Sequence, residues 1–177
     1  MVGLDGHLTL HGKGGDMIEP QDMVEAFARN VQVIQAQTKG LSHAQCLLQL
    51  PFRGNCMNWV LGHMVDSRNN LLLAVGEKPI LTDEESARYR HGSEPVCADG
   101  KDVIRLERML SLLQHSQERM ASALPRLTPD DLAREVRDHR GAITLANRLF
   151  FLYYHDTYHT GQTELLRQLA GTDDKII

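Results

Sequence analysis

Two histidines, His155 and His159, interrupt an apolar stripe in the segment FFLYYHDTYHTGQ near the C-terminus. Residues four apart on a helix lie one above the other, so both imidazoles reach the same point in space and, in neutral form, can bind one divalent metal ion. The pair alone is weak evidence, because it can equally be two half-buried histidines bonded to backbone or water. His7 and His11 have the same spacing in a glycine-rich segment, which shows how easily the pattern arises by chance.

A third histidine, His63, lies between Trp59 and Ser67 on the inner stripe of another expected helix, in the segment NWVLGHMVDSRNNL. A lone histidine on an apolar face is usually a satisfied core residue. Three on the inner faces of two helices would each need separate hydrogen-bond partners, whereas one shared ion satisfies a nitrogen on each. Three protein ligands also leave open coordination positions, as catalytic metal sites do. The sequence therefore predicts a metal site formed by His63, His155 and His159.

Four long segments with apolar residues at alternating spacings of three and four must position these histidines. We expect helices from a capping box at Asp16–Glu19 to Gly40, from Asn55 as N-cap to Val75, from an Asp99 or Asp102 cap through Val103 to Leu124, and from about Thr144 to Leu169. Shorter helical turns are expected after Ser42, Thr82 and Thr128. No alternating strand pattern is evident, and residues 134–141 are polar. The pattern predicts an all-α four-helix bundle.

Length and composition narrow the class of protein. The 177 residues fit one domain, expected over 17–177, after a loose arm over 1–16 that contains five glycines. The net charge of −4 gives no electrostatic indication of nucleic-acid binding, and no apolar run is long enough to indicate a membrane span. Three cysteines without a close pair argue against a disulfide scaffold. A cytoplasmic location is the default expectation.

Two strings carry a resemblance to a known family. Asn58-Trp59-Val60-Leu61-Gly62-His63 and His155-Asp-Thr-Tyr-His159-Thr-Gly161-Gln162 resemble the corresponding segments of the DinB-like (YfiT-like) four-helix-bundle superfamily. The resemblance covers about residues 17–170 and implies an up-down-down-up bundle with a long crossover between the second and third helices. It also implies metal-ligand roles for the three histidines, and a homodimer.

Members of this superfamily include thiol-dependent S-transferases and maleylpyruvate isomerases. The resemblance therefore favours a metal-dependent transferase or isomerase that uses a low-molecular-weight thiol and acts on a small-molecule substrate. Two alternatives remain open: a metal-dependent hydrolase of a small substrate, and a non-catalytic, stress-related metal-binding or scaffold protein. Zinc or nickel is the expected ion, although imidazole ligands suit several divalent metals. The sequence identifies no catalytic residue.

Three residues are weaker candidates for contacts with substrate or with the metal ligands. Trp59 precedes His63 by one turn, which places its indole near the expected ion. Asp66 could be a hydrogen-bond acceptor or a base, although a surface carboxylate is the commoner case. Gln162 could orient His159, bind substrate or simply pack in the bundle.

Other polar residues receive no catalytic role from the sequence. Asp156 should point away from the metal, because it lies about 100° around the helix from His155. Cys56 heads a helix, where a thiol pKa can fall, but a small buried residue is the favoured interpretation. The four remaining histidines are expected in loops or on charged faces: His43, His91, His115 and His139.

Overall fold

The computed structural model describes residues 19–138, 141–172 and 174. The arm over 1–16, the start of the expected domain at residue 17, Asp16 of the expected capping box and His139 lie outside them. The helices are α1 (Pro20–Thr38), α2 (Met57–Ala74), α3 (Asp83–Tyr89), α4 (Leu106–Ala123), α5 (Pro129–Ala133) and α6 (Leu145–Leu169). Short 3-10 turns occupy Gln45–Leu47 and Leu124–Arg126, and the strands are β1 (Glu135–Asp138) and β2 (Gly141–Thr144).

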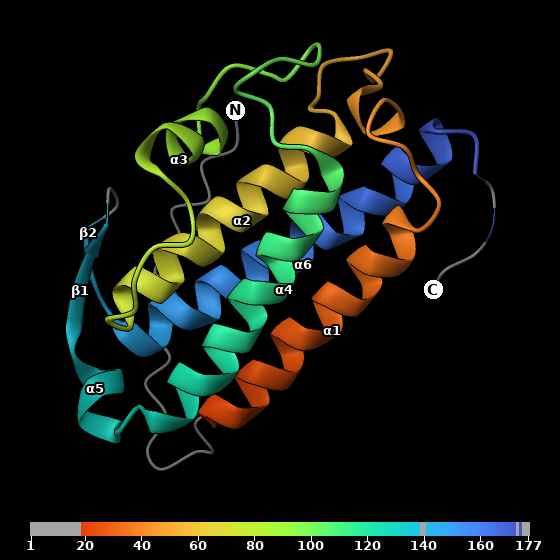
Figure 1. Cartoon of the computed structure of the whole chain (residues 1–177). Helices are drawn as coiled ribbons and strands as arrows, with labels where there is room; N and C mark the ends of the chain where they lie inside the picture. Colours follow the sequence, from red (N-terminus) through yellow and green to blue (C-terminus); the bar gives the residue numbers. More distant parts are fainter. Residues whose placement is uncertain (1–18, 139–140, 173, 175–177) are drawn as a thin grey trace.

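The four long helices α1, α2, α4 and α6 form the bundle that the sequence predicts. In Figure 1, α1 and α6 run in one direction and α2 and α4 in the other, which is an up-down-down-up arrangement. Helices α1 and α2 each pack against both α4 and α6. Residues 75–105, which include α3, return the chain from the end of α2 to the start of α4, and this is the expected long crossover.

Most helix ends follow the local signals in the sequence. Thr82 and Thr128 each begin a capping box, with Glu85 and Asp131 as the reciprocal partners. Gly76, with φ of +82°, follows the end of α2 in the left-handed conformation that glycine adopts without strain. Thr144 caps α6 by accepting a hydrogen bond from the backbone N–H of Asn147.

Three expected helix starts are wrong by a few residues. The N-cap of α1 is Glu19 rather than Asp16, and its side chain makes no capping hydrogen bond. Cys56 rather than Asn55 is the N-cap of α2, and its side chain makes no capping hydrogen bond. Helix α4 begins at Leu106 with Arg105 as N-cap, not at an Asp99 or Asp102 cap. The backbone N–H of Ile104 donates to the Tyr89 hydroxyl at 2.8 Å, so the segment just before α4 is hydrogen-bonded to the end of α3.

A small antiparallel hairpin corrects the expectation that the chain has no strand. Strands β1 and β2 pair with Glu135 opposite Thr144 and Asp138 opposite Gly141. Each strand has only four residues, and one of them is mostly polar, so no period of two stands out in the sequence. The hairpin and α5 lie together at one end of the bundle, where α2 ends and the crossover begins (Figure 1).

A buried ion pair fixes α2 against α6. The Nε and Nη2 groups of Arg68 donate to the two carboxylate oxygens of Asp156 at 2.9 and 2.8 Å, and both side chains are 1% exposed. Arg68 also donates to the backbone carbonyl of Phe27, and Asn30 donates to Asp156 at 2.8 Å, so α1 joins the same network. The Asp156 carboxylate is therefore engaged with α1 and α2, and the register of α2 and α6 is set next to the histidines.

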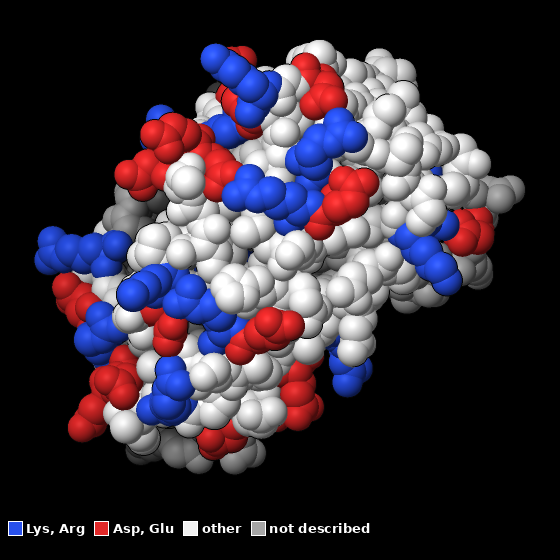
Figure 2. Space-filling view, in the orientation of Figure 1, with Lys and Arg blue, Asp and Glu red and all other residues white. Residues whose placement is uncertain are grey.

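The outer surface seen in Figure 2 carries basic and acidic side chains that alternate, without an extended area of one sign. Within the described part of the chain, no helix combines the length and apolar character required to cross a membrane.

Candidate metal centre

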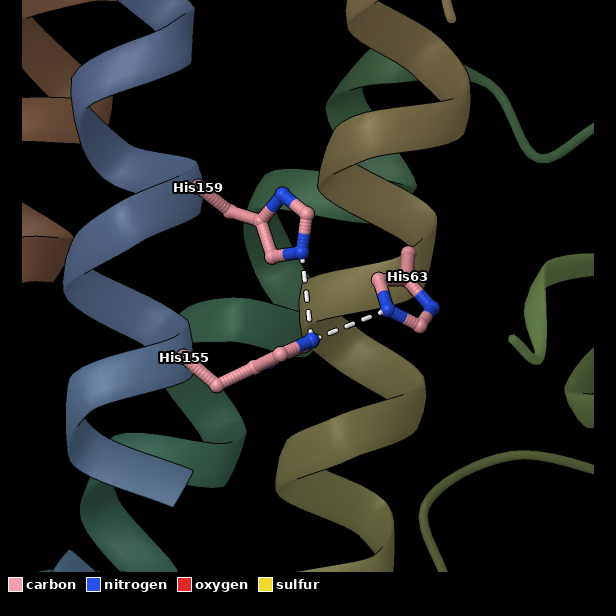
Figure 3. Close-up of side chains that lie close together, drawn as sticks. All are labelled: His63, His155 and His159. Carbon is pink, nitrogen blue, oxygen red and sulfur yellow. Dashed lines mark hydrogen bonds between the residues drawn. The ribbon is translucent and has the colours of Figure 1, made fainter. Parts of the chain in front are cut away.

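The three histidines that the sequence singled out meet between α2 and α6 (Figure 3). His155 and His159 project from α6 toward His63 on α2. The Nε2 atom of His155 lies 3.1 Å from Nε2 of His63 and 3.1 Å from Nε2 of His159. One ring nitrogen from each residue lies within 4.8 Å of the others, and this is the metal-ligand group found among the described residues.

Two of the rings are held by hydrogen bonds on their other nitrogen. Nδ1–H of His63 donates to the backbone carbonyl of Tyr89 at 2.8 Å, and Nδ1–H of His159 donates to Oε1 of Gln162 at 2.6 Å. Because both partners are acceptors, each Nδ1 carries the proton and each Nε2 presents a lone pair to the centre. Metal-bound histidines are oriented in this way.

The third ring indicates that a cation fits here. Lone pairs from His63 and His159 both face Nε2 of His155, and a single N–H there cannot make a full hydrogen bond to both. Nδ1 of His155 is buried and has no hydrogen-bond partner among the described residues. Two nitrogens bound tetrahedrally at ~2.0–2.1 Å lie about 3.3 Å apart, close to the separations seen. The donor set and its spacing therefore suit a divalent metal ion.

Burial keeps the cluster in the neutral form that binds metals. Removal from water lowers the pKa of His63 to about 4 and that of His155 to about 3, with further lowering of both by the neighbouring His159. Burial also lowers the pKa of His159, against a smaller opposing effect of its bond to Gln162. No proton has to leave these rings at neutral pH before an ion binds.

The α2 segment around His63 is shaped to receive Tyr89 at the end of α3. A Cβ atom on Gly62 would lie 2.1 Å from Cδ1 of Tyr89, so only glycine lets the ring pack on α2. The Tyr89 hydroxyl donates to Oδ1 of Asn58 at 2.9 Å, one turn earlier on α2. Asn58 and Gly62 thus place the Tyr89 carbonyl where His63 needs an acceptor. The role of Tyr89 could not be predicted from the sequence, because any residue type can supply a backbone carbonyl.

Comparison with known proteins identifies the family and supports the fold. A family model described as the DinB superfamily matches residues 26–163, which is most of the chain and includes all three histidines. The chain belongs to the DinB superfamily. A solved structure of a conserved protein from Enterococcus faecalis matches with a TM-score of 0.67 at 15% identity, over 86% of this chain and 97% of that one. That likeness supports the fold alone. No curated protein matches the sequence at a significant level.

Two of the weaker candidates in this DinB-superfamily chain contact the histidines directly. The Trp59 indole stacks on the His63 ring, with ring centroids 4.8 Å apart and planes 20° apart, and its Nε1–H donates to Ser93 at 3.0 Å. Gln162 accepts the hydrogen bond from His159 described above. Of the three roles considered for Gln162, the structure thus supports orientation of His159.

Asp66 is not the surface carboxylate that its polar sequence context favoured. It is 3% exposed and accepts hydrogen bonds from the Ser86 hydroxyl and, at 3.5 Å, from Asn70. Burial raises its pKa, although Ser86 and the charge of Arg90 act in the opposite direction. Helix α2 has fifteen buried residues of eighteen, so even the flank that carries Asp66 is covered.

The favoured interpretation of Cys56 agrees with the structure. It is buried, its thiol donates to the backbone carbonyl of Val96 at 3.2 Å, and burial raises its pKa. A reactive thiol needs the opposite shift.

Two cavities adjoin the histidine cluster. One of about 530 Å³ is lined by His63 and His155 together with Asp66, Arg90 and His91, and a smaller one of about 260 Å³ is lined by His159 together with Trp59 and Gln162. His91, to which the sequence gave no role, thus lines the larger cavity. A ligand in either cavity can approach the point where the imidazoles meet.

Proposed function

We propose that this protein binds a divalent metal ion, with zinc or nickel as the expected metal, through His63, His155 and His159. We further propose that it acts as a transferase or isomerase that uses a low-molecular-weight thiol on a small-molecule substrate. The single observation that carries the proposal is the convergence of three neutral imidazoles beside two cavities large enough for ligands. A bound ion would supply a Lewis acid that holds a thiol in its thiolate form.

The chain's own residues perform the remaining work at this site. Tyr89 and Gln162 hold two imidazoles in the tautomer that presents Nε2, and Trp59 covers one face of His63. The two cavities bring ligands to the imidazoles while the surrounding helices limit the access of water. Asp66 faces the larger cavity, and burial raises the pKa of its carboxyl, so it is placed to exchange a proton with a ligand there. Hydrolysis of a small substrate is the second candidate, favoured by this placement of Asp66.

The test uses Trp59, the single tryptophan of the chain, as a reporter. Protein purified without a histidine tag or nickel column is analysed for metal, and 2-mercaptoethanol is then titrated into the metal-loaded protein. We expect saturable quenching of the emission that is absent after chelation and absent in His159→Ala. Emission that stays constant while metal is bound contradicts thiol binding and favours a scaffold role. A change that persists without metal contradicts the proposed site.

We also propose a cytoplasmic homodimer, and the outer face of α6 supports the assembly. Phe150, Tyr154, Tyr158 and Leu165 are exposed large hydrophobic residues on one side of this helix, with Tyr154 at 62% and Leu165 at 64% exposure. Within residues 145–169, none of the exposed side chains is charged. Aromatic enrichment and depletion of charge are characteristic of the centre of an interface. A second copy of the same face meets it without like-charge repulsion, although each chain carries a net charge of −4.

A further inference from the structure

The two cavities lie on opposite sides of the histidine cluster along the interface of α2 and α6. Helix α2 contributes Trp59 and Val60 to the smaller cavity, but Ser67 and Asn70 to the larger one. Helix α6 runs antiparallel to α2 (Figure 1) and contributes residues between 159 and 166 to the smaller cavity and residues between 148 and 155 to the larger. The two sets of lining residues do not overlap. The cluster therefore has two distinct approaches.

The two linings differ in chemistry. The smaller cavity is mostly apolar, with Phe52, Leu165 and Leu166 in its wall and Arg53 as its charged member. The larger cavity contains two arginines, Arg90 and Arg148, together with His91 and Asp66. Each cavity therefore suits a different kind of molecule.

Among the described residues that line the larger cavity, arginines outnumber acidic side chains. Arg90 and Arg148 are charged at every accessible pH. Asp66 is the one acidic residue among the described residues of this wall, and burial raises its pKa, which disfavours the charged form. The same wall therefore holds two guanidinium groups and one carboxyl. A metal ion on the three histidines would add two further positive charges.

The positive charge in this wall affects other groups that line the cavity. The charge of Arg90 reaches the Asp66 carboxyl, where it opposes the rise in pKa that burial causes. Arg148 also lies over the Phe151 ring, with its Cζ 6.0 Å from the ring centroid, and both residues line the cavity. Guanidinium groups recognise carboxylate and phosphate oxygens through paired N–H donors.

We propose that the larger cavity binds a small molecule through an oxyanion group, a carboxylate or a phosphate, held by Arg90 and Arg148 beside His155. The smaller cavity then receives an uncharged, apolar partner molecule, so the histidine cluster stands between two ligands of opposite character. This assignment rests on the proposed function for its catalytic meaning, since a group transfer needs two ligands at one centre. The anion site itself is testable without catalysis and without metal.

The experiment measures anion binding to the full chain by isothermal titration calorimetry, on zinc-loaded and on chelated protein. The probes are succinate, inorganic phosphate and the neutral analogue succinamide. We compare wild type with Arg90→Gln and Arg148→Gln, and use Arg53→Gln in the smaller cavity as the matched control. Circular dichroism and the thermal midpoint show that each variant is folded.

We expect succinate or phosphate to bind wild type and succinamide not to bind. Arg90→Gln and Arg148→Gln should each raise the dissociation constant of the anion about tenfold, whereas Arg53→Gln should leave it unchanged. The preferred anion identifies whether carboxylate or phosphate is recognised. Absence of anion binding to wild type, or equal losses in Arg53→Gln, overturns the proposal. Anion binding that is unchanged in both Arg90→Gln and Arg148→Gln also overturns the proposal, because the anion is then held elsewhere, for example directly by zinc.

Metal analysis of the same samples separates this proposal from the proposed function. Arginine-dependent anion binding that survives chelation supports the subsite even if the histidines prove not to hold an ion. Conversely, wild type that binds zinc but no anion overturns the subsite and leaves the metal site standing.

Discussion

Two hydrogen-bond acceptors orient imidazole rings in the candidate metal centre. The carbonyl of Tyr89 and the amide oxygen of Gln162 each accept a hydrogen bond from an Nδ1–H group, and this decides that Nε2 faces the centre. Residues in this position are usually worth a factor of about 10–100 in metal affinity, because they fix both the tautomer and the ring orientation. Metal binding should therefore depend on residues that never touch the ion.

Gln162→Ala tests this dependence. We expect the zinc dissociation constant to rise about tenfold or more, since His159 loses its acceptor while all three ligands remain. Competition with a chromophoric chelator measures the affinity. Gln168→Ala is the control, because Gln168 is exposed on the same helix and lies away from the cluster. Equal affinities in the two variants would show that Gln162 is only a packing residue.

The lowered pKa values predict how the metal-free protein responds to acid. An unfolded histidine takes up a proton near pH 6.5, whereas folded His63 and His155 stay neutral down to about 4 and about 3. Below pH 6.5 the unfolded state thus binds more protons, and acidification lowers the free energy of unfolding. The loss is of order 1–2 kcal/mol per histidine between pH 6.5 and 5.

Urea unfolding of chelated protein at pH 7 and pH 5 measures this loss. The variant His155→Leu should show a smaller loss than wild type, because one of the responsible groups is gone. An identical pH dependence in both proteins would mean that His155 titrates normally.

At the residue scale, the sequence was sufficient to predict that the three histidines converge, but not what surrounds them. His63, His155 and His159 could be predicted because helical spacing places their Cβ atoms on inner faces. Asp66 was expected on the surface but is buried. Helix α2 is covered on almost all sides, so the burial of Asp66 could not be predicted from an amphipathic stripe. Arg90 and His91 reach the larger cavity through the crossover, whose path depends on tertiary packing.

At the scale of elements, the contact between α2 and α3 is the one on which the site most depends. Gly62 is the point of closest approach, and Tyr89 is anchored there from both ends, by its ring against α2 and by its hydroxyl between Asn58 and Ile104. The long helices were predictable because each carries a continuous signal over many turns. The hairpin was not, since four-residue strands are shorter than the pattern that would identify them.

Gly62→Ala and Gly161→Ala form a matched pair within helices of the bundle. An added methyl at Gly62 would overlap the Tyr89 ring, so we expect a loss of about 1–3 kcal/mol in the free energy of unfolding and weaker zinc binding. At Gly161 the same methyl meets nothing within 4 Å, so alanine should stabilise α6 by about 0.5–1 kcal/mol. Denaturant unfolding gives both values. If Gly62→Ala is as stable as wild type, α3 does not pack as described.

At the scale of the whole molecule, the uncharged outer face of α6 predicts an assembly of about 40 kDa, twice the chain mass of 19.9 kDa. Tyr154→Glu places a charge at the middle of this face and should dissociate the dimer at micromolar concentration, because an unpaired carboxylate would be buried between the copies. Light scattering measures the mass. Leu73→Glu, an exposed leucine on α2, is the control and should leave the mass unchanged. A wild-type monomer would contradict the assembly.

His63 and His155 are 92 residues apart in the chain, yet their ring nitrogens lie 3.1 Å apart. An ion held by both would close a long loop, as a reversible cross-link does, and a covalent link across roughly 100 residues removes on the order of 5 kcal/mol of chain entropy from the unfolded state. Such a link opens when the ion leaves. The lifetime of the folded chain in a cell would then follow the concentration of free metal, and a chelator would act on this protein in the way that a reductant acts on a disulfide.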